Sequence, residues 1–495
     1  MREQLFHYEK ARQLLKDSHP LVEMQDDQRF KALFAFLQGW HAVWGPFRDI
    51  TLDEDQIRQY FEQALELYRA IDYPRGIALA LHWIGNSYWA SGQELSSREQ
   101  DLLRAQQYLL EARTIQEEIG DIFGLAHTLM NLGNIASTAR RPDEGKALLL
   151  KSLALREQIG NRVQIAHTLH NLGVNALNLG SVAEARQFLQ TSVAHYRDMG
   201  VVSHAAWDLC SLGDIAHEES DFEAARTFYL EGLALVEETE HSQLTADLRS
   251  GLAWVAWAQG NYDEAETLIE QVHQGSRALN QSYAMHALFL KGWIALARSN
   301  YGRAQELFET SLQIGQELAI QKHVVECRVS LAISLFRQGN IDRARQHLQA
   351  SLAFYRDDAA HTIFDPLTHK TLLAEALGPM GAIDGARGDY AAARAHLREA
   401  LALAWDTPGI ATALGVIATT AEVVVDQAQP ERAVEIGALV QCDARIYAID
   451  KTRVNQLLAE LEATLPPELY AAAVERGQAL DLEAVVAELL AEGKP

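Results

Sequence analysis

The chain has 495 residues, of which 48% are hydrophobic and 22% charged, and its formal charge is −24 with neutral histidines. An acidic chain repels phosphate backbones, which argues against sequence-independent nucleic-acid binding. Only 11 prolines stand among many Ala, Leu, Glu and Gln residues, so the composition predicts a soluble and almost entirely helical fold.

The opening residues and the cysteines predict the compartment. The N-terminal sequence MREQLFHYEKARQLLKD alternates charged and apolar residues, which predicts a short helix within residues 1–25 rather than a secretion signal. Nowhere does the chain approach the ~18 consecutive apolar residues of a membrane span. Cys210, Cys327 and Cys442 are far apart and form no CxxC pair. We therefore expect a cytoplasmic protein with no disulfide framework and no membrane segment.

A repeat of about forty residues follows the N-terminal helix. Gly133, Gly173 and Gly213 stand forty residues apart. A second series of small residues continues at steps of 39 to 49 and comprises Gly145, Ala185, Ala225, Ala265, Ala304, Ala344, Ala393 and Ala433. A fixed period of this size is typical of solenoid proteins, in which each unit buries its apolar face only by stacking on the next.

Each repeat is predicted to contain two antiparallel helices. In the repeat over residues 161–200, apolar residues recur at three- and four-residue steps from Val163 to Leu179, as in an amphipathic helix. Gly180 ends this helix, because glycine adopts the left-handed conformation at little cost. Ser181 then starts the second helix and forms a predicted capping box with Glu184.

The small residues mark where the two helices of a repeat approach each other closely. Gly173 lies on the first helix, Ala185 and Ser192 lie on the second, and Leu189 fills the space between them. This pattern resembles the tetratricopeptide repeat in its forty-residue variety. The resemblance covers residues 26–447 and implies an all-α fold: a right-handed α-solenoid superhelix of about ten helix pairs.

Residues 448–495 depart from the repeat and are predicted to form C-terminal capping helices, which a solenoid needs at its end. The tail resembles that of bacterial STAND-type signalling ATPases and large LuxR-type regulators, on the residues Glu431-Arg432-Ala433, Gly437, Leu465-Pro466-Pro467, Tyr470 and Gly477 through Leu482. The resemblance implies the sensor part of such a signalling protein. No GxxxxGK[ST] phosphate loop occurs in the chain, so an ATPase module would have to be supplied elsewhere.

The spacing of chemically active residues predicts no catalytic or metal site. His217-Glu218-Glu219 lacks the second histidine of an HExxH zinc helix. His167 and His170 are one helical turn apart, but no cysteine or carboxylate nearby in the sequence completes a metal site. No nucleophile, base and orienting acid can be assembled either. We therefore expect a non-enzymatic protein with no cofactor and no metal.

Polar and aromatic residues gather on the first helices, which line the concave face in the tetratricopeptide family. This face is rich in His, Asn and Trp, which combine hydrogen bonding with flat apolar contact, rather than in the Lys and Glu of a merely wet surface. We predict a ligand groove over repeats 2 to 7, with ligand contacts from His82, Asn86, His127, Asn134, His167, His170, Trp207, Asp214, Asp247 and Trp254.

The predicted groove leads to one leading hypothesis on function and two alternatives. The leading hypothesis is a sensor whose groove binds a protein, a peptide or a small polar ligand, with histidines that gain charge between about pH 7 and 6. In a plainer interpretation of the groove, some of its tryptophans fill the core and the histidines are solvated. The first alternative function is a constitutive assembly scaffold that uses its ends or convex face to hold subunits together, with a homo-oligomer formed through its end helices or an absent ATPase module. The second alternative is a peptide-pheromone receptor of the Rap-like kind, which would need a larger helical head before residue 26.

Overall fold

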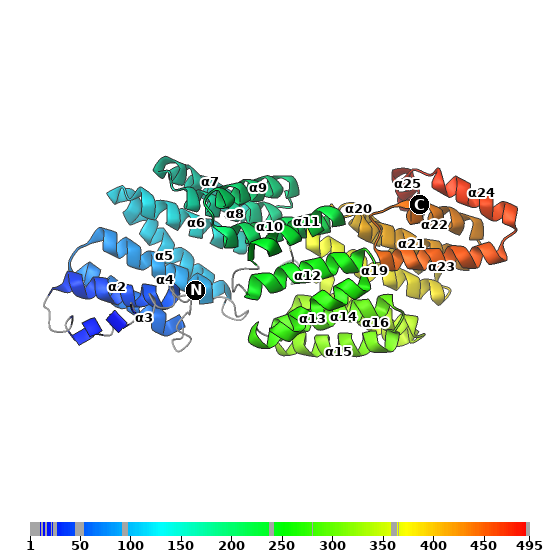
Figure 1. The fold of residues 1–495 in the computed structure, drawn as a ribbon, viewed down its shortest axis with the longest axis horizontal. Coiled ribbons are helices and arrows are strands. Elements are labelled where there is room, and N and C mark those ends of the chain that lie inside the picture. The colour runs from blue at the N-terminus through cyan, green and yellow to red at the C-terminus, as the bar shows by residue number, and fades with distance from the viewer. Residues whose placement is uncertain are drawn as a thin grey trace. The chain divides into compact units, whose positions relative to one another are not determined.

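The computed structural model describes residues 10, 13–14, 17–20, 22, 27–44, 54–91, 98–236, 242–279, 281–357, 364 and 366–491. The chain divides into two compact units, Met1–Val201 and Val202–Pro495, here called unit 1 and unit 2. Within the described residues every regular element is a helix (Figure 1). The predicted all-α repeat fold is therefore confirmed, while most of the helix predicted within residues 1–25 lies outside the described residues.

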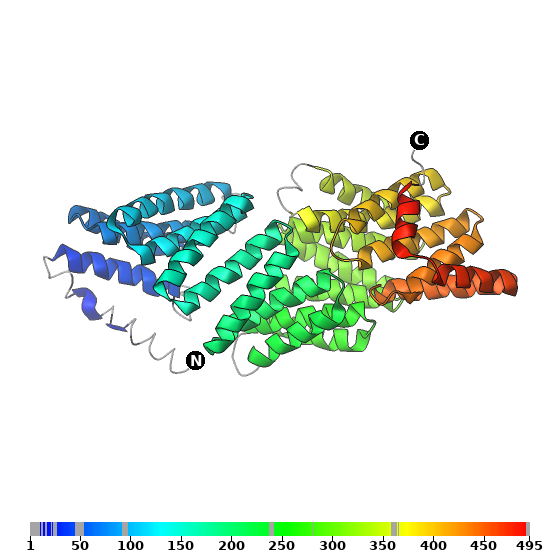
Figure 2. The same ribbon diagram turned by 90° about the horizontal axis from the view of Figure 1, so that it is seen from above.

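Unit 1 contains four antiparallel helix pairs (Figure 2, blue to teal). The first helices of neighbouring pairs also contact one another, from α4 to α6 and from α6 to α8. The pairs are α2 (Gln28–Trp44) with α3 (Glu54–Ala70), α4 (Pro74–Ser91) with α5 (Arg98–Ile119), α6 (Ile122–Thr138) with α7 (Pro142–Ile159), and α8 (Arg162–Asn178) with α9 (Val182–Asp198).

Unit 2 contains six pairs, so the described residues hold the ten pairs that the repeat predicts. These pairs are α10 (Val202–Glu218) with α11 (Phe222–Val236), α12 (Ser242–Ala258) with α13 (Tyr262–Leu279), α14 (Gln281–Ala297) with α15 (Tyr301–Glu317), α16 (Gln321–Arg337) with α17 (Ile341–Tyr355), α19 (Pro366–Ala386) with α20 (Tyr390–Trp405), and α21 (Ala411–Asp426) with α22 (Pro430–Cys442).

Three further helices follow the last pair: α23 (Ala448–Thr464), α24 (Pro467–Gln478) and α25 (Leu482–Ala491). Pro467 occupies the first turn of α24, and the Asp481 carboxylate caps α25 by accepting a hydrogen bond from the Ala484 amide at 2.9 Å. Helix α24 packs on α22, and α25 packs on α20. The C-terminal segment is therefore helical and covers the end of the repeats.

Local sequence signals explain most helix ends. Gly160 and Gly180 have φ of 75° and 71°, the left-handed conformation that lets glycine end a helix. The predicted capping box at Ser181 is wrong, because the Ser181 side chain makes no cap hydrogen bond. The Glu184 carboxylate that would complete the box instead accepts a hydrogen bond from Lys146 Nζ at 2.7 Å.

The small-residue positions lie where the two helices of a pair touch. A Cβ atom on Gly173 would lie 2.7 Å from Leu189 Cγ, and one on Gly213 would lie 2.5 Å from the Tyr229 ring. Ser192, which is fully buried, donates a hydrogen bond to the Ala166 carbonyl on the facing helix at 2.9 Å. The predicted close packing within the pairs is thus confirmed.

Candidate functional site

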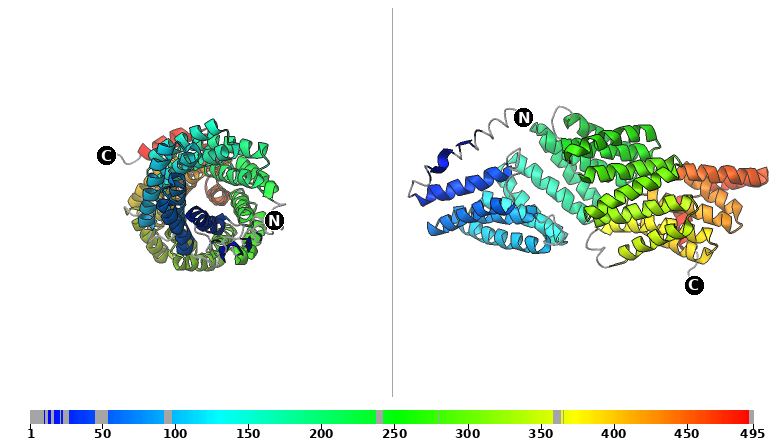
Figure 3. Two further views of the ribbon diagram at one scale, coloured as in Figure 1. Left: turned by 90° about the vertical axis from the view of Figure 1, so that its left-hand side faces the viewer. Right: turned by 90° about the horizontal axis from the view of Figure 1, so that it is seen from below.

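The first helices of unit 2 surround a cavity of about 1010 Å³. Its wall is formed by α10, α12, α14, α16, α19 and α21, each in contact with the next, together with the start of α23 (Figure 3, green to orange). The wall closes where the Ala411 amide at the start of α21 donates a hydrogen bond to Ser220 Oγ, just after α10, at 3.1 Å. The concave face of unit 2 is therefore a closed ring rather than an open groove.

Two close approaches seal this ring. A Cβ atom on Gly409 would lie 1.9 Å from the Glu218 carbonyl oxygen, so no side chain fits where the loop before α21 meets α10. Tyr447, just before α23, packs its ring 5.5 Å from Trp257 and 5.8 Å from Phe222. Segments more than 180 residues apart in the chain thus form one wall.

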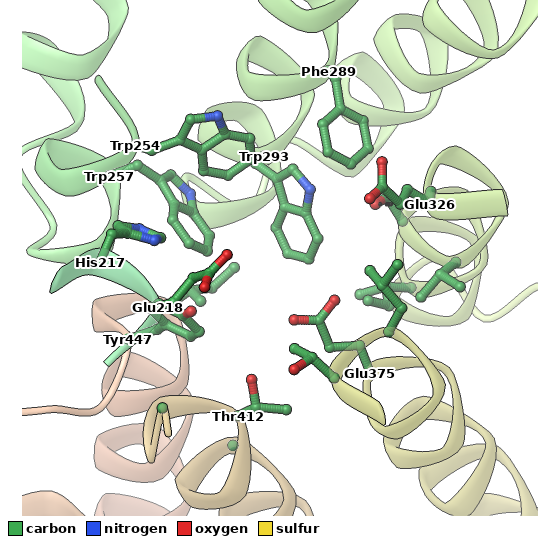
Figure 4. A pocket seen from close by; sticks show the side chains of 18 of the residues that line it. His217, Glu218, Trp254, Trp257, Phe289, Trp293, Glu326, Glu375, Thr412 and Tyr447 are labelled. Atoms are coloured by element: carbon green, nitrogen blue, oxygen red, sulfur yellow. Dashed lines mark hydrogen bonds between the residues drawn. The ribbon is translucent and has the colours of Figure 1, made fainter. Parts of the chain in front are cut away.

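An aromatic surface covers one side of the cavity (Figure 4). The Trp257 ring lies 5.6 Å from Trp254 and 5.3 Å from Trp293, in edge-to-face geometry, and Phe289 lies 6.0 Å from Trp254. Trp257 is only 6% exposed, and its Nε1 donor has no hydrogen-bond partner. A buried donor without a partner is costly, so this wall is not built for stability alone.

Two carboxylates face the aromatic surface across the cavity, Glu326 on α16 and Glu375 on α19 (Figure 4). Burial raises the pKa of each to about 7, and the neighbouring Glu326 raises the pKa of Glu375 further. Within the described residues neither carboxylate forms a hydrogen bond. The His323 Nδ1 atom lies 3.9 Å from Glu326, too far for one. His323 stays neutral, because burial lowers its pKa to about 3.

Two aspartates on α10 and α12 also line the cavity, each held by a tyrosine. Asp214 accepts a hydrogen bond from Tyr229 Oη at 2.6 Å, and Asp247 accepts one from Tyr283 Oη at 2.8 Å. Burial raises the pKa of Asp214 to about 6 and raises that of Asp247. Asp214 borders the open cavity, so solvent can reach it although protein surrounds it.

The cationic groups of the cavity are mostly neutralised by one cluster. Arg453 contacts Glu422 at 3.0 Å and Asp450 at 2.7 Å, and Arg337 lies 3.7 Å from Glu422. The two arginines lower the pKa of Glu422, against the effect of its burial. Lys322 is the remaining cation among the described lining residues. The rest of the cavity is therefore net acidic.

Four of the ten predicted ligand contacts line this cavity: Trp207, Asp214, Asp247 and Trp254. The other six lie in unit 1. His82 is 7% exposed and shares a 3.0 Å hydrogen bond between its Nδ1 and Thr128 Oγ1.

The remaining unit 1 residues also lie on first helices. Asn86 accepts a hydrogen bond from Asn131 Nδ2 at 3.3 Å, and the His127 ring lies 4.9 Å from Phe123. The residues Asn134, His167 and His170 are partly buried, and the first two accept hydrogen bonds through their carbonyls.

The expectation that groove histidines gain charge between pH 7 and 6 is wrong for His82 and His127. Burial lowers their pKa to about 3 and about 4. Three carboxyls of the cavity have pKa values near neutrality, Glu326 and Glu375 at about 7 and Asp214 at about 6.

The sequence prediction missed Glu326, Glu375 and the contribution of α23. Yet both glutamates lie six residues before the small residue of their first helix, Ala332 or Gly381. Asp247 has the same spacing from Ala253, so extending the repeat index by two units would have found them. No repeat signal could have found Tyr447 or Asp450, because they follow the last repeat helix, α22, which ends at Cys442.

A buried cluster of Ser311, His323 and Cys327 superficially resembles catalytic machinery. The Ser311 Oγ and His323 Nε2 atoms are 2.7 Å apart, and Cys327 Sγ is 3.2 Å from the same nitrogen. However, burial raises the pKa of the Cys327 thiol to about 12, and all three side chains are almost fully inaccessible. The cluster therefore offers no reactive thiolate.

The described residues contain no group of three or more His, Cys, Asp or Glu side chains arranged to hold a metal ion. Among the same residues, no helix combines the length and apolar character needed to cross a membrane.

Comparison with known families identifies the repeat. Residues 124–198 and 204–278 match a model of the tetratricopeptide repeat, and residues 324–357 and 374–399 match two further models of this repeat. The chain therefore contains tetratricopeptide repeats. No match to a curated protein was found.

Two solved structures share the fold. The apo form of the quorum sensor NprR from B. thuringiensis superposes with a TM-score of 0.53 and 12% identity, over 71% of this chain and 97% of its own. Aspartyl phosphate phosphatase F from Bacillus subtilis gives a TM-score of 0.50 and 12% identity, over 72% of this chain and 94% of its own. At such identities the likeness concerns the fold alone.

Proposed function

We propose that the chain is a non-enzymatic recognition module that binds a peptide, a segment of a protein or a small polar ligand in the cavity of unit 2. The observation that carries this proposal is the cavity itself, about 1010 Å³ in volume and walled by the first helices of six successive repeats. This volume is at the upper end of the range typical of ligand pockets, ~300–1000 Å³. The shared fold of a quorum sensor makes a peptide one ligand class worth testing.

The composition of the wall supports recognition over mere packing. Ligand sites typically combine a mostly apolar and aromatic lining with a few polar groups. Here the aromatic lining comes from Trp254, Trp257 and Trp293. The polar groups are the carboxyls of Glu326 and Glu375. Carboxylates with raised pKa values destabilise the empty fold when charged, which is the expected cost of a site formed before its ligand arrives.

We further propose that binding is transmitted as a signal through the C-terminal helices. Tyr447, Asp450 and Arg453 at the start of α23 belong to the cavity wall, and α24 packs on α22 behind it. A ligand in the cavity would therefore touch the segment whose sequence resembles STAND-type sensors. A ligand that slows hydrogen exchange in the cavity wall but leaves α23–α25 unchanged would contradict this transmission.

The proposal is tested by a binding screen of peptides and metabolites against the full chain and its Trp207→Ala/Trp254→Ala double variant. Each aromatic anchor that contacts the ligand is expected to contribute ~2 kcal/mol or more, so the double variant should lose most of its affinity. The matched control is Trp40→Ala, which removes a tryptophan of similar exposure, 44% against 42% for Trp207, from unit 1. A ligand that binds the double variant as tightly as the wild type would disprove the cavity assignment.

An assembly scaffold is the second candidate function, favoured by the surface of unit 1. Leu103 and Leu110 on α5 are 55% and 42% exposed, and Phe123 on α6 is 55% exposed. Large exposed apolar side chains are candidates for a protein interface. If they mediate self-association, sedimentation velocity should show a concentration-dependent oligomer that a Leu103→Glu/Leu110→Glu variant abolishes. A chain that stays monomeric at every concentration would remove self-assembly as a role.

A further inference from the structure

We infer that the cavity of unit 2 binds an organic cation, an ammonium or guanidinium group carried on an apolar body, between the tryptophan wall and the carboxylates of Glu326 and Glu375. The inference rests on the proposed function, since it names the ligand class for the same cavity. Two sources of this chemistry fit, a basic side chain of a peptide and a small organic amine.

The first step is the charge balance of the cavity wall. Arg337 and Arg453 are matched by Glu422 and Asp450, with which they form ion pairs of 2.7 to 3.7 Å. Beyond this cluster, the described lining residues carry the acidic groups Asp214, Glu218, Asp247, Glu326 and Glu375 against one cation, Lys322. A cationic ligand would reduce this excess of negative charge, whereas an anionic one would add to the repulsion.

The second step is that the charged and polar groups at the centre lack partners. Within the described residues no hydrogen bond reaches the carboxylate of Glu326 or Glu375, and both border the open cavity. Tyr355 lines the same region, is 1% exposed, and has a hydroxyl without a hydrogen-bond partner. Burial raises the pKa of the Tyr355 hydroxyl, and the negative charges of Glu326 and Glu375 raise it further. Groups of this kind are kept where a ligand completes their bonding.

The third step is the position of the aromatic rings. Trp254, Trp257 and Trp293 lie across the cavity from Glu326 and Glu375 (Figure 4). The face of an indole attracts a cation, and the attraction grows when water is excluded. Indole rings on one side and carboxylates on the other would hold the charged head of an alkylammonium or guanidinium group together with its apolar stem. A metal ion lacks a ligand set, because no three candidate ligands of the described chain converge.

The fourth step is that the repeat itself brings the acids together. Asp247, Glu326 and Glu375 share one position, six residues before the small residue of the first helix. In the tenth repeat the same position is Gly415, and there the Asp450 carboxylate of α23 approaches to within 3.0 Å of where a Cβ atom would lie. One inward-facing position of the ring is thus acidic in three repeats and is supplied with an acid from outside in a fourth.

Protonation gives this site a defined pH dependence. Because the pKa of Glu326 and of Glu375 is about 7, both carboxyls lose their negative charge as the pH falls below about 7. Among the histidines that line the cavity, burial lowers the pKa of His217 to about 4 and that of His323 to about 3, so both stay neutral over this range, and burial also lowers the pKa of His286. Lys322, Arg337 and Arg453 stay charged, so the carboxyls govern the change. Affinity for a cation should therefore fall as the pH falls from 8 to 5.5.

The test uses isothermal titration calorimetry of the full chain with three probes. These are 1,5-diaminopentane, an end-blocked hexapeptide alternating Lys with Leu, and the same peptide with Gln in place of Lys. We expect one or both cationic probes to bind at pH 8, at least about tenfold more weakly at pH 5.5, while the Gln peptide binds weakly or not at all. Binding of the amine alone or of the Lys peptide alone identifies the source of the cation.

Variants locate the site. The double variant Glu326→Gln/Glu375→Gln should lower the affinity for the cationic probe at least about tenfold at pH 8. Trp254→Ala should lower this affinity as well. Glu264→Gln is the matched control in unit 2, because Glu264 is paired with Arg226 outside the cavity. Thermal unfolding of each variant shows whether it is folded.

The outcomes separate the inference from the proposed function. If neither cationic probe binds at pH 8, or if the double glutamine variant binds it unchanged, the cation inference is overturned. If the Gln peptide binds and Trp254→Ala weakens it, the proposed function stands without the cation. If a cationic probe binds but neither the glutamate nor the tryptophan variant affects it, both the inference and the cavity assignment fail.

Discussion

Unit 1 and unit 2 are built from the same repeat but use the inner face of its first helices differently. In unit 1 the polar residues of this face bond to one another, as His82 does with Thr128 and Asn131 with Asn86. In unit 2 the first helices surround a cavity, and Glu326 and Glu375 face it without hydrogen-bond partners among the described residues. One repeat can thus serve as structure or as a binding wall, depending on whether its polar groups find partners within the chain.

A buried arginine of unit 1 bonds to the next helix through one nitrogen, while its Nε and Nη2 atoms have no hydrogen-bond partner among the described residues. Arg156 is 1% exposed, and its Nη1 donates to the Gln164 carbonyl at 2.7 Å and to Thr168 Oγ1 at 2.6 Å. In unit 2 the tryptophan wall lies on the first helices α12 and α14 and lines the cavity. The comparison predicts that unit 1 residues govern stability, whereas cavity residues of unit 2 govern binding.

The largest expected effect follows from filling a close helix contact in unit 1. Gly173→Leu forces side-chain atoms into the space occupied by Leu189 and should lower the free energy of unfolding by ~1–3 kcal/mol or more. Because coupling in a solenoid runs between neighbours, hydrogen exchange should accelerate first in α6–α9. Gly302→Leu is the control, since nothing lies within 4 Å of a Cβ atom there. Uniform acceleration along the chain would contradict the division into two units.

A smaller effect is expected where the ring of unit 2 closes. Gly409→Ala places a methyl group against the Glu218 carbonyl and must displace the loop that carries the hydrogen bond between Ala411 and Ser220. We expect a loss of ~1–2 kcal/mol and faster hydrogen exchange confined to α10, α21 and α23. Gly275→Ala, in open space, should have no such effect. Unchanged exchange in all three helices would show that closure does not depend on this contact.

The negative charges of Glu375 and Glu422, both in unit 2, should have opposite effects on the stability of the fold. The pKa of Glu375 is raised above its unfolded value, so its carboxylate costs stability as the pH rises from about 4.5 through about 7. Glu375→Gln should therefore raise the melting temperature at pH 8 and leave it unchanged at pH 4.5. The gain in free energy of unfolding at pH 8 should be on the order of 1 kcal/mol, because solvent in the cavity screens the charge.

Glu422→Gln is the matched opposite. The pKa of Glu422 is lowered by Arg453 and Arg337, so its carboxylate adds stability at pH 8 that is lost as the pH falls below its usual range. Its replacement should lower the melting temperature at pH 8. Shifts of the same sign in both variants, measured by calorimetry, would contradict the assignment of Glu375 to a ligand rather than to the fold.

The smallest expected effect concerns the histidines of unit 1. Burial holds the pKa of His127 near 4, so this residue carries no charge change between pH 8 and 5.5. His127→Gln should leave the pH profile of ligand binding unchanged within about twofold. A profile that flattens in this variant, but not in Glu326→Gln, would assign the pH response to unit 1.

The fold was predictable from sequence because many independent positions repeat. The columns that contain Gly173, Gly213 and Ala185, together with the glycines that end helices, agree on ten helix pairs. The predicted capping box at Ser181 failed because Lys146 of the preceding repeat draws the Glu184 carboxylate away. A single sequence motif does not reveal such a competitor from the neighbouring repeat.

The cavity was predictable only in part. Repeat indexing placed Trp207, Asp214, Asp247 and Trp254 on one face, and the structure brings these four to one cavity. The closure of that face by Gly409 and by the start of α23 depends on the curvature accumulated over six repeats, which no local pattern specifies. The sequence also could not show that burial lowers the pKa values of His82 and His127, because burial depends on how neighbouring helices pack.

The central claim is that unit 2 recognises ligands while unit 1 is structural, and hydrogen exchange of the full chain tests it most directly. Exchange would be followed by mass spectrometry at pH 8 with and without a saturating cationic probe, the Lys-Leu hexapeptide or 1,5-diaminopentane. We predict slower exchange in the cavity helices α10, α12, α16 and α19 and in the first turn of α23, with α4–α8 unchanged. Protection in α4–α8 that leaves the cavity helices untouched would contradict this account.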